Sequence, residues 1–273
     1  MSKLRSDINI SGQGARYILD DNKIVSLFKN CETIKELAKF FNVSEPTIKR
    51  RLRLFGVKRE PKYTLDENVF SSFTPESCYW AGFIAADGWV GSNHKKKKIY
   101  IGLADKDTNH LNKMCKFFKR DISTVRHIIC DGKYVQCRLE IGNKKIVEDL
   151  VNNFNVVQAK SFILQPPTKI LENLIKHYIR GYFDGDGCIS FDKTSKIVKF
   201  NIISASPNIL PWMNEIISQN TEIKIKVGCR KDRIYYLQTS GVKAQLILDW
   251  LYYDSTQETR LDRKYERYLS YKN

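Results

Sequence analysis

The chain has 273 residues, of which 42% are hydrophobic, so it is long enough for one large domain or two to three small ones with a real core. Its 46 lysines and arginines outnumber 30 acidic residues, and the resulting net charge of +16 is typical of proteins that bind polyanions. No apolar run approaches the roughly 20 residues of a transmembrane helix, and the N-terminus lacks a signal-peptide apolar region, which excludes a membrane-spanning protein. A basic ribosomal or membrane-surface protein remains the alternative.

The cysteines and histidines indicate no metal site of the zinc type. The seven cysteines form no Cys-x-x-Cys pair, and we interpret them as reduced thiols of a cytoplasmic protein from a phage, bacterial or organellar host. The histidines, His94, His110, His127 and His177, are not clustered at metal-ligand spacings. This spacing argues against the histidine-based nucleases.

Residues 22–57 predict a small helical unit. The stretch 33–41 has apolar positions at helical spacing, and Thr33 with Glu36 forms a capping box at its start. Ser44 is a candidate N-cap for a second helix after a tight turn.

This pair of helices resembles a helix-turn-helix. In that motif the second helix enters a major groove of DNA. Here this would bring Thr47, Lys49 and Arg50 near bases or phosphates. A helical hairpin with a solvated basic face is the alternative. We expect an all-α DNA-binding domain at 1–60 and a linker at 61–74.

Two stretches farther along the chain are copies of each other. YWAGFIAADG begins at Tyr79 and YIRGYFDGDG begins at Tyr178, and their shared Tyr, Gly, Asp and Gly recur at the same offset of 99 residues. Constant spacing of this kind indicates an internal repeat.

Each copy predicts an apolar helix with small residues four positions apart, which lets two helices approach backbone to backbone. The small residues of this predicted seam are Gly82 and Ala86 in one copy and Gly181 and Gly185 in the other. Each helix then ends on an aspartate and a glycine, Asp87 with Gly88 and Asp186 with Gly187. A helix C-terminus is a poor place for an anion, so we expect the paired carboxylates to share divalent cations.

The same order of elements is expected after each helix. The first copy predicts two strands, a helix, two strands and a helix at about 89–94, 98–104, 107–119, 123–130, 133–141 and 143–153. The second predicts them at about 188–192, 197–204, 207–219, 222–229, 233–239 and 241–251.

Basic and polar residues are expected on the open face of the resulting sheets. The run between the first two strands is expected to contact phosphate through Lys95, Lys96, Lys97 and Lys98. Residues 223–227 alternate apolar and basic side chains. The residues expected to share one DNA-facing surface are Arg126, Arg138, Lys199, Asn201, Lys226, Arg230 and Arg233. For any one of them, an ordinary solvated sheet face is the alternative.

The repeated stretches WAGFIAADG and IRGYFDGDG resemble the two motifs of a single-chain LAGLIDADG homing endonuclease, and the resemblance covers roughly 75–270. It implies an α+β fold in which two pseudo-symmetric αββαββα repeats, 75–168 and 169–273, form a DNA-binding antiparallel β saddle. The first copy has Ala85 where the motif usually carries an acid, whereas the second keeps Asp184. The later acid of each motif is the catalytic one in this family.

The resemblance also implies a site and an activity. The catalytic acids would be Asp87 and Asp186, which would bind Mg²⁺ or another divalent cation such as Mn²⁺ together with Gly88 and Gly187. The family's basic residue after the last repeat helix is carried over to Lys160 and Lys264. The implied activity is a staggered double-strand break by metal-dependent phosphodiester hydrolysis at a long asymmetric target, made by a monomer on double-stranded DNA.

Other functions remain open on the sequence. A non-catalytic transcription regulator of the same fold would lack the acids, and both are present. An RNA maturase that acts on intron RNA is compatible with the basic saddle. An intein would show splice-junction residues at its ends, so we expect a free-standing protein. A plain structural DNA-binding protein would not explain two carboxylates at a helix seam.

Overall fold

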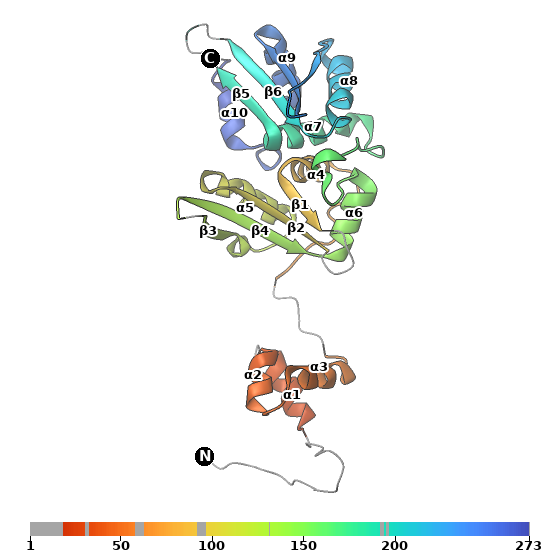
Figure 1. The fold of residues 1–273 in the computed structure, drawn as a ribbon, viewed down its shortest axis with the longest axis vertical. Helices are drawn as coiled ribbons and strands as arrows, with labels where there is room; N and C mark the ends of the chain where they lie inside the picture. The colour runs from red at the N-terminus through yellow and green to blue at the C-terminus, as the bar shows by residue number, and fades with distance from the viewer. Residues whose placement is uncertain are drawn as a thin grey trace. The chain divides into compact units, whose positions relative to one another are not determined.

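The computed structural model describes residues 19–30, 33–57, 63–91, 97–130, 132–191, 194 and 197–272. The chain divides into two compact units, Met1–Tyr63 and Thr64–Asn273 (Figure 1). Over these residues there are ten α-helices and two four-stranded antiparallel sheets. None of the helices in the described ranges is both long enough and apolar enough to cross a bilayer.

The smaller unit consists of three helices, α1 (Asp21–Lys29), α2 (Ile34–Phe40) and α3 (Glu45–Leu54). The predicted capping box is present, because Thr33 and Glu36 each bond the backbone N–H of the other. The core of this unit consists of Ile24, Phe28, Leu37, Ala38, Ile48 and Leu52. The helical character predicted for this stretch is therefore present.

The first repeat of the larger unit has the predicted order of elements. It contains α4 (Pro75–Asp87), β1 (Gly88–Gly91), β2 (Lys98–Ala104), α5 (Thr108–Phe117), β3 (Arg126–Cys130), β4 (Tyr134–Gly142) and α6 (Lys144–Phe154). Its sheet has the order β1-β2-β4-β3. The buried residues alternate along β2 and β4, so one face packs on the core and the other is open.

The second repeat reproduces this arrangement. It contains α7 (Glu172–Asp186), β5 (Gly187–Phe191), β6 (Val198–Ser204), α8 (Ile209–Thr221), β7 (Val227–Cys229), β8 (Tyr235–Ser240) and α9 (Val242–Tyr252). Its sheet order, β5-β6-β8-β7, matches that of the first repeat. The predicted α+β class with two αββαββα repeats is confirmed, and the helix-turn-helix of the smaller unit remains a prediction. One further helix, α10 (Asp262–Leu269), follows the second repeat and was not predicted.

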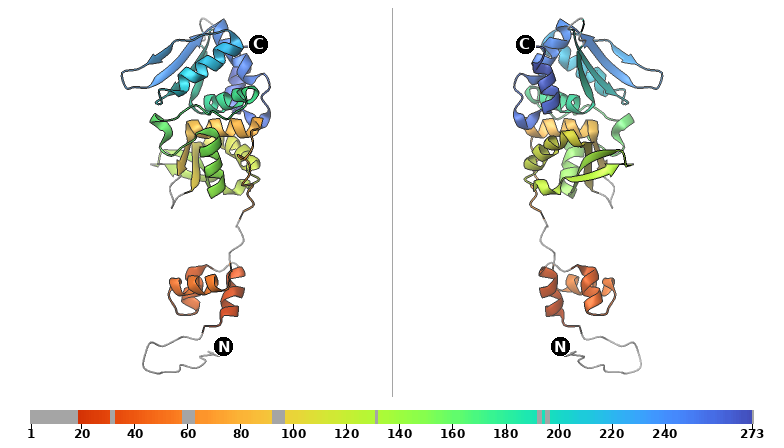
Figure 2. Two further views of the ribbon diagram at one scale, coloured as in Figure 1. Left: turned by 90° about the vertical axis from the view of Figure 1, so that its right-hand side faces the viewer. Right: turned by 90° about the vertical axis from the view of Figure 1, so that its left-hand side faces the viewer.

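The two repeats meet at α4 and α7, which lie side by side between the strands of the two halves in both views of Figure 2. A Cβ at Gly82 would overlap the carbonyl oxygen of Tyr178, and a Cβ at Gly181 would overlap that of Tyr79. The two contacts are reciprocal, so the helices pack backbone to backbone about a pseudo-twofold axis. The seam predicted from the small residues is therefore present.

One predicted strand is largely absent. Residues 223–226 are not in a strand, and β7 begins only at Val227. Ile223 and Ile225 are buried, as their alternation predicts. The backbone of Ile225 instead pairs with the side chain of Asn214, which accepts from its N–H at 3.1 Å and donates to its carbonyl at 2.7 Å. The alternating pattern of residues 223–227 thus reflects a half-buried extended segment whose backbone bonds to the side chain of Asn214.

The linker predicted at 61–74 is also wrong over most of its length. Residues 64–74 belong to the larger unit, where Phe70 is fully buried beside Phe117, Phe118 and Phe154. The backbone N–H of Asp66 bonds to the carbonyl of Phe118 at 2.9 Å. Aromatic packing and hydrogen bonds together attach this segment to the first repeat.

Candidate nuclease site and nucleic-acid interface

The two predicted catalytic aspartates are adjacent. Asp87 ends α4 and Asp186 ends α7, five residues after Gly82 and Gly181, where the two helices approach most closely. A Cβ at Gly185 would lie 3.4 Å from Oδ2 of Asp87, which places the Asp87 carboxylate against the end of α7. Asp87 is exposed and Asp186 is half-buried, so both remain accessible to a ligand.

Both carboxyls bind protons more tightly than free aspartates. Burial raises the pKa of Asp186 to about 6, and the neighbouring Asp87 adds to the shift, while Lys160 and Lys264 oppose it. The pKa of Asp87 is also raised, mainly because surrounding protein desolvates it even though its surface is accessible. Desolvated neighbouring carboxylates of this kind favour a bound cation.

The two predicted basic residues reach this site, but they bind carbonyls. Lys160 Nζ donates to the carbonyl of Ala86 at 3.2 Å. Lys264 Nζ donates to the carbonyls of Phe183, Asp184 and Gly185 at 2.6, 2.7 and 3.2 Å. Each buried ammonium therefore caps the C-terminus of one seam helix and offsets the negative end of its dipole.

Burial changes the acidity of these lysines. It lowers the pKa of Lys264 to about 8, against the attraction of Asp184 and the two site aspartates. It also lowers the pKa of Lys160, with Asp186 and Asp87 opposing the shift. A lysine with a lowered pKa can release a proton near neutral pH, which suits acid–base chemistry.

A polar hollow of about 210 Å³ adjoins Asp186. It is lined by Ala85, Ala86, Lys160, Ser161, Leu164, Tyr182, Asp186, Ser204, Ala205 and Ser206. Because a water occupies about 30 Å³ of the liquid, the hollow has room for several. Tyr182 donates to Ser204 at 3.0 Å on its wall, whereas the first repeat has Phe83 at the corresponding motif position. The surroundings of the two aspartates are therefore unequal.

Asp184 has a structural role that the sequence did not reveal. Its buried carboxylate accepts from the hydroxyls of Tyr79 and Tyr252 at 2.7 and 2.8 Å, and from the N–H of Leu261 at 2.7 Å. Since Tyr79 gives its proton to Asp184, the contact of 3.3 Å between Tyr79 and His110 Nε2 must be donated by the histidine. Asp184 thus connects α7 with α4, α9 and the start of α10.

Arg180 is the second buried charge that the sequence did not reveal. Its guanidinium is fully buried and donates to the carbonyls of Leu251 and Thr259, both at 2.9 Å, and to Asp254 at 3.0 Å. It also donates to His177 Nδ1 at 2.8 Å, and burial with this cation lowers the pKa of His177 to about 4. Arg180 therefore attaches the segment between α9 and α10 to the seam.

The segment that carries each lysine is bound by the opposite repeat. In the first turn of α10, Arg263 forms a bidentate pair with Asp107 of the first repeat, with both bonds at 3.1 Å. After α6, the hydroxyl of Ser206 in the second repeat lies 3.1 Å from the carbonyl of Lys160 and accepts from the N–H of Leu164 at 2.9 Å. Each lysine is thus positioned by the partner repeat.

Positions 88 and 187, at the ends of the two helices, hold glycine because a side chain would not fit there. Gly88 has φ −82° and ψ 148°, and Gly187 has φ −89° and ψ 164°, so neither needs the left-handed conformation. A Cβ at Gly88 would lie 2.7 Å from the carbonyl oxygen of Ile84. The two glycines adjoin the aspartates, as predicted, and their part in binding metal remains a prediction.

The donor set fits a hard divalent cation. Two carboxylates adjoin at the seam, and across the described ranges no group of three His, Cys, Asp or Glu side chains could hold a metal. Mg²⁺ commonly binds one or two protein carboxylates and completes its shell with water and phosphate oxygens. The site therefore suits an ion that is bound by two protein carboxylates and takes its remaining ligands from water and phosphate.

The open face of the first sheet carries the predicted arginines. Arg126 of β3 and Arg138 of β4 lie directly opposite each other, and both side chains are accessible. Lys97 and Lys98 instead form ion pairs with Glu148 at 3.5 Å and Glu140 at 3.0 Å. Lys95 and Lys96 lie outside the described residues.

The second sheet bears fewer of the predicted contacts. Lys199 and Asn201 lie on the open face of β6. Lys226 precedes β7, and Arg230 and Arg233 lie in the turn between β7 and β8. These three basic residues are therefore at the rim of the sheet: β7 and β8 begin later than predicted, which leaves Lys226 and Arg233 outside them, and Arg230 lies between the two strands as predicted.

In the smaller unit the three predicted residues all lie on α3. Lys49 and Arg50 are exposed, and Lys49 is 3.5 Å from Glu45. Thr47 is half-buried, and its hydroxyl lies 3.0 Å from that of Ser44, which makes no capping bond to the backbone. Their role in DNA binding remains a prediction.

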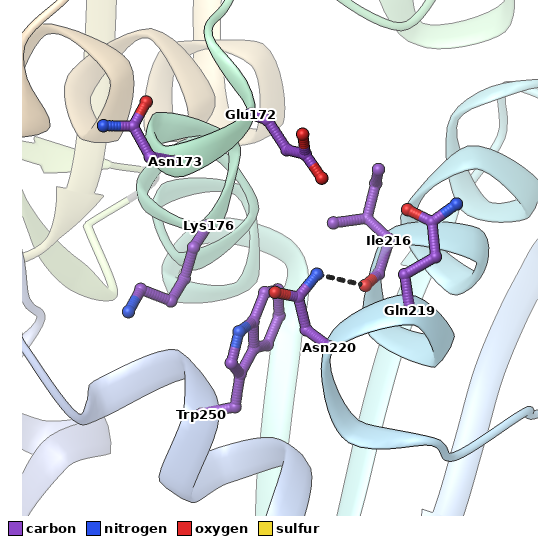
Figure 3. Close-up of a pocket in the computed structure, with 7 residues that line it drawn as sticks. All are labelled: Glu172, Asn173, Lys176, Ile216, Gln219, Asn220 and Trp250. Atoms are coloured by element: carbon purple, nitrogen blue, oxygen red, sulfur yellow. Dashed lines mark hydrogen bonds between the residues drawn. The ribbon is translucent and has the colours of Figure 1, made fainter.

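A separate hollow of about 230 Å³ lies at the opposite end of α7 (Figure 3). It is lined by Glu172, Asn173, Lys176, Ile216, Gln219, Asn220 and Trp250. A helix rises about 1.5 Å per residue, so Glu172 is roughly 20 Å from Asp186 along α7. This hollow is therefore separate from the carboxylate site.

Comparison with solved structures finds LAGLIDADG proteins. The I-LtrWI homing endonuclease bound to target DNA matches with TM-score 0.45 and 14% identity, over 73% of this chain and 91% of that one. The homing endonuclease I-WcaI bound to its DNA recognition sequence matches with TM-score 0.49 and 12% identity, over 76% and 94%. The N-terminal LAGLIDADG domain of DUF199/WhiA matches with TM-score 0.42 and 16% identity, over 74% and 92%.

These neighbours are the proteins that the repeated motif resembles. No protein-family model and no curated protein that we compared with the chain matches it. With identities this low, the assignment of function rests on the residues of the site itself.

Proposed function

We propose that this protein is a metal-dependent endonuclease that makes a staggered break in double-stranded DNA at a long asymmetric target. The observation that carries the proposal is the pair Asp87 and Asp186, two accessible carboxylates that end adjoining helices. A purely structural role gives no reason to place two desolvated acids at the negative ends of helices.

The seam residues would each have a part in hydrolysis. Asp87 and Asp186 would hold Mg²⁺ or Mn²⁺, which when bound supplies an activated water and neutralises charge on the phosphate. Lys160 and Lys264, held against the helix ends by backbone carbonyls, add positive charge beside the phosphate and the leaving oxygen. The lowered pKa of Lys264 lets it give or take a proton near neutral pH.

The overall charge and the sheets support DNA as the substrate. A net charge of +16 favours a polyanion, and Arg126 and Arg138 face outward from the open side of the first sheet. One aspartate per repeat suits one scissile phosphate on each strand. Because the two repeats differ in sequence, a single chain would recognise an asymmetric site as a monomer.

The test is cleavage of a randomised duplex library with Mg²⁺ by the native chain, Asp87→Asn and Asp186→Asn. We expect double-strand cutting by the native chain and its loss in both variants, because each removes a metal ligand. Glu215→Gln, an exposed acid on α8, is the matched control and should cut normally. Retained DNA binding by the variants in Ca²⁺ would show that they are folded.

Specific binding without cutting by the native chain, over a range of Mg²⁺ and Mn²⁺ concentrations, would overturn the nuclease proposal and favour a DNA-binding regulator. Equal binding of intron RNA and duplex DNA would instead favour the maturase.

A further inference from the structure

The open faces of the two sheets carry different chemistry at equivalent places. In the first sheet, Arg126 and Arg138 form a directly opposed pair on β3 and β4. They border a hollow of about 150 Å³ together with Tyr100, Arg120, Thr124, Ile128 and Glu140. Three guanidinium groups around one hollow form a site for hydrogen-bond acceptors.

The arginine at the centre of this sheet is oriented. Arg138 Nε donates to Oε1 of Gln136 at 2.7 Å, and its guanidinium lies 5.6 Å from the ring centroid of Tyr100. Glu140 shares the hollow, but Lys98 pairs with it at 3.0 Å. A side chain held by a neighbour and a ring loses less freedom on binding, which favours a directed contact.

In the second sheet, neighbouring positions on the open faces of β6 and β8 carry carboxamide side chains. Asn201 of β6 lies directly opposite Gln238 of β8, and Cys188 of β5 lies opposite Asn201 on the other side. Gln238 is exposed. Oδ1 of Asn201 is buried and has no hydrogen-bond partner among the residues that the structure describes. Because buried polar atoms are nearly always paired, this oxygen is an acceptor that the described residues leave without a donor.

Base edges in the major groove distinguish these two kinds of side chain. Guanine presents two acceptors, O6 and N7, that match the fork of an arginine, whereas adenine presents an acceptor and a donor that match a carboxamide. Glutamate accepts from N4 of cytosine, the partner of guanine, so Glu140 is consistent with a guanine–cytosine pair at the first sheet. Duplex RNA has a major groove too narrow for such a sheet.

We propose that the two repeats read different bases: the first sheet reads guanine through Arg126 and Arg138, and the second reads adenine through Asn201 and Gln238. This inference rests on the proposed binding of duplex DNA, but not on cleavage. The preferred target then has guanine in one half-site and adenine in the other, at positions set by these four side chains.

The test is selection of bound duplexes from a randomised library by the full chain, with Ca²⁺ present to prevent cutting. The native chain is compared with Arg138→Lys, Arg138→Gln and Gln238→Leu. Arg138→Lys keeps the charge but loses the fork, so it separates base reading from phosphate contact. Lys243→Gln, an exposed lysine of α9 on the covered side of the second sheet, is the control.

We expect both Arg138 variants to lose preference for guanine at one position, by about 5- to 150-fold, with the adenine positions unchanged. Gln238→Leu should lose an adenine preference in the other half-site by a similar factor. The control should select the native target. Competition with duplex RNA of the selected sequence should be weak.

Three results would overturn this inference. The first is a native target without guanine and adenine in opposite halves, which leaves the DNA-binding proposal intact. The second is Arg138→Lys selecting the native target unchanged, which would assign Arg138 to a phosphate. The third is no selection of duplex DNA by the native chain, which would refute the proposed function as well.

Discussion

Replacing Gly181 by alanine should separate the two seam helices. A Cβ at this position would overlap the carbonyl oxygen of Tyr79 and lie 2.8 Å from its carbonyl carbon and 2.9 Å from the nitrogen of Phe83. These are backbone atoms, so no side chain can move aside. Overpacking of this kind costs about 3 kcal/mol. The better helix propensity of alanine returns about 1 kcal/mol, so we expect a net loss of about 2 kcal/mol.

Tryptophan fluorescence in urea measures this loss in the relevant unit. All four tryptophans, Trp80, Trp89, Trp212 and Trp250, lie in the larger unit, so the smaller one does not contribute to the signal. For a unit of this size the melting temperature should fall by roughly 4 to 8 °C.

Gly142→Ala is the matched control for the seam. A Cβ at Gly142 meets nothing within 4 Å, so its substitution should change the free energy of unfolding by less than about 0.5 kcal/mol. If Gly181→Ala and Gly142→Ala had the same stability within about 0.5 kcal/mol, the backbone-to-backbone seam would be refuted.

Three further outcomes can be measured with the same fluorescence signal. The folded protein raises the pKa of Asp186 from 3.8 to about 6, so ionising this group costs stability as pH rises between those values. Asp186→Asn should therefore have a higher melting temperature than the native chain at pH 8. A difference in melting temperature that persists below pH 3.8 would contradict this. Arg180→Lys should lose about 3 kcal/mol or more of unfolding free energy, because one ammonium cannot replace the five-donor fork, and a loss below about 1 kcal/mol would contradict the network. A double-mutant cycle of Arg263→Ala and Asp107→Ala should give a coupling energy of about 1 to 2 kcal/mol, and additivity within about 0.3 kcal/mol would show that the pair does not connect the repeats.

The repeat made much of the larger unit predictable. The constant offset of the two motifs, together with apolar periodicity, predicted the order of helices and strands in both repeats and the approach of Gly82 and Gly181. These are local patterns, and the close helix contact follows directly from the absence of side chains. The strand order within each sheet and the extra helix α10 did not follow. Helix α10 is short and rich in charged residues, and its single apolar face was overlooked.

The buried charges were missed because their partners are distant along the chain. Asp184 bonds to Tyr79, Tyr252 and Leu261, and Arg180 bonds to residues beyond α9. A signal was nevertheless present. The first copy of the motif has alanine at both corresponding positions, Ala81 and Ala85. A charge that replaces alanine in an otherwise apolar repeated helix indicates a partner unique to that copy.

The mutual support of the two lysine-bearing segments by the opposite repeats affects the engineering of such a chain. Asp107 of the first repeat holds the segment with Lys264, and Ser206 of the second holds the segment with Lys160. Each helix end is thus capped by a lysine of its own repeat, whereas the other repeat holds the segment that carries this lysine. A gene cut between the repeats should yield two fragments that reassemble and are inactive alone.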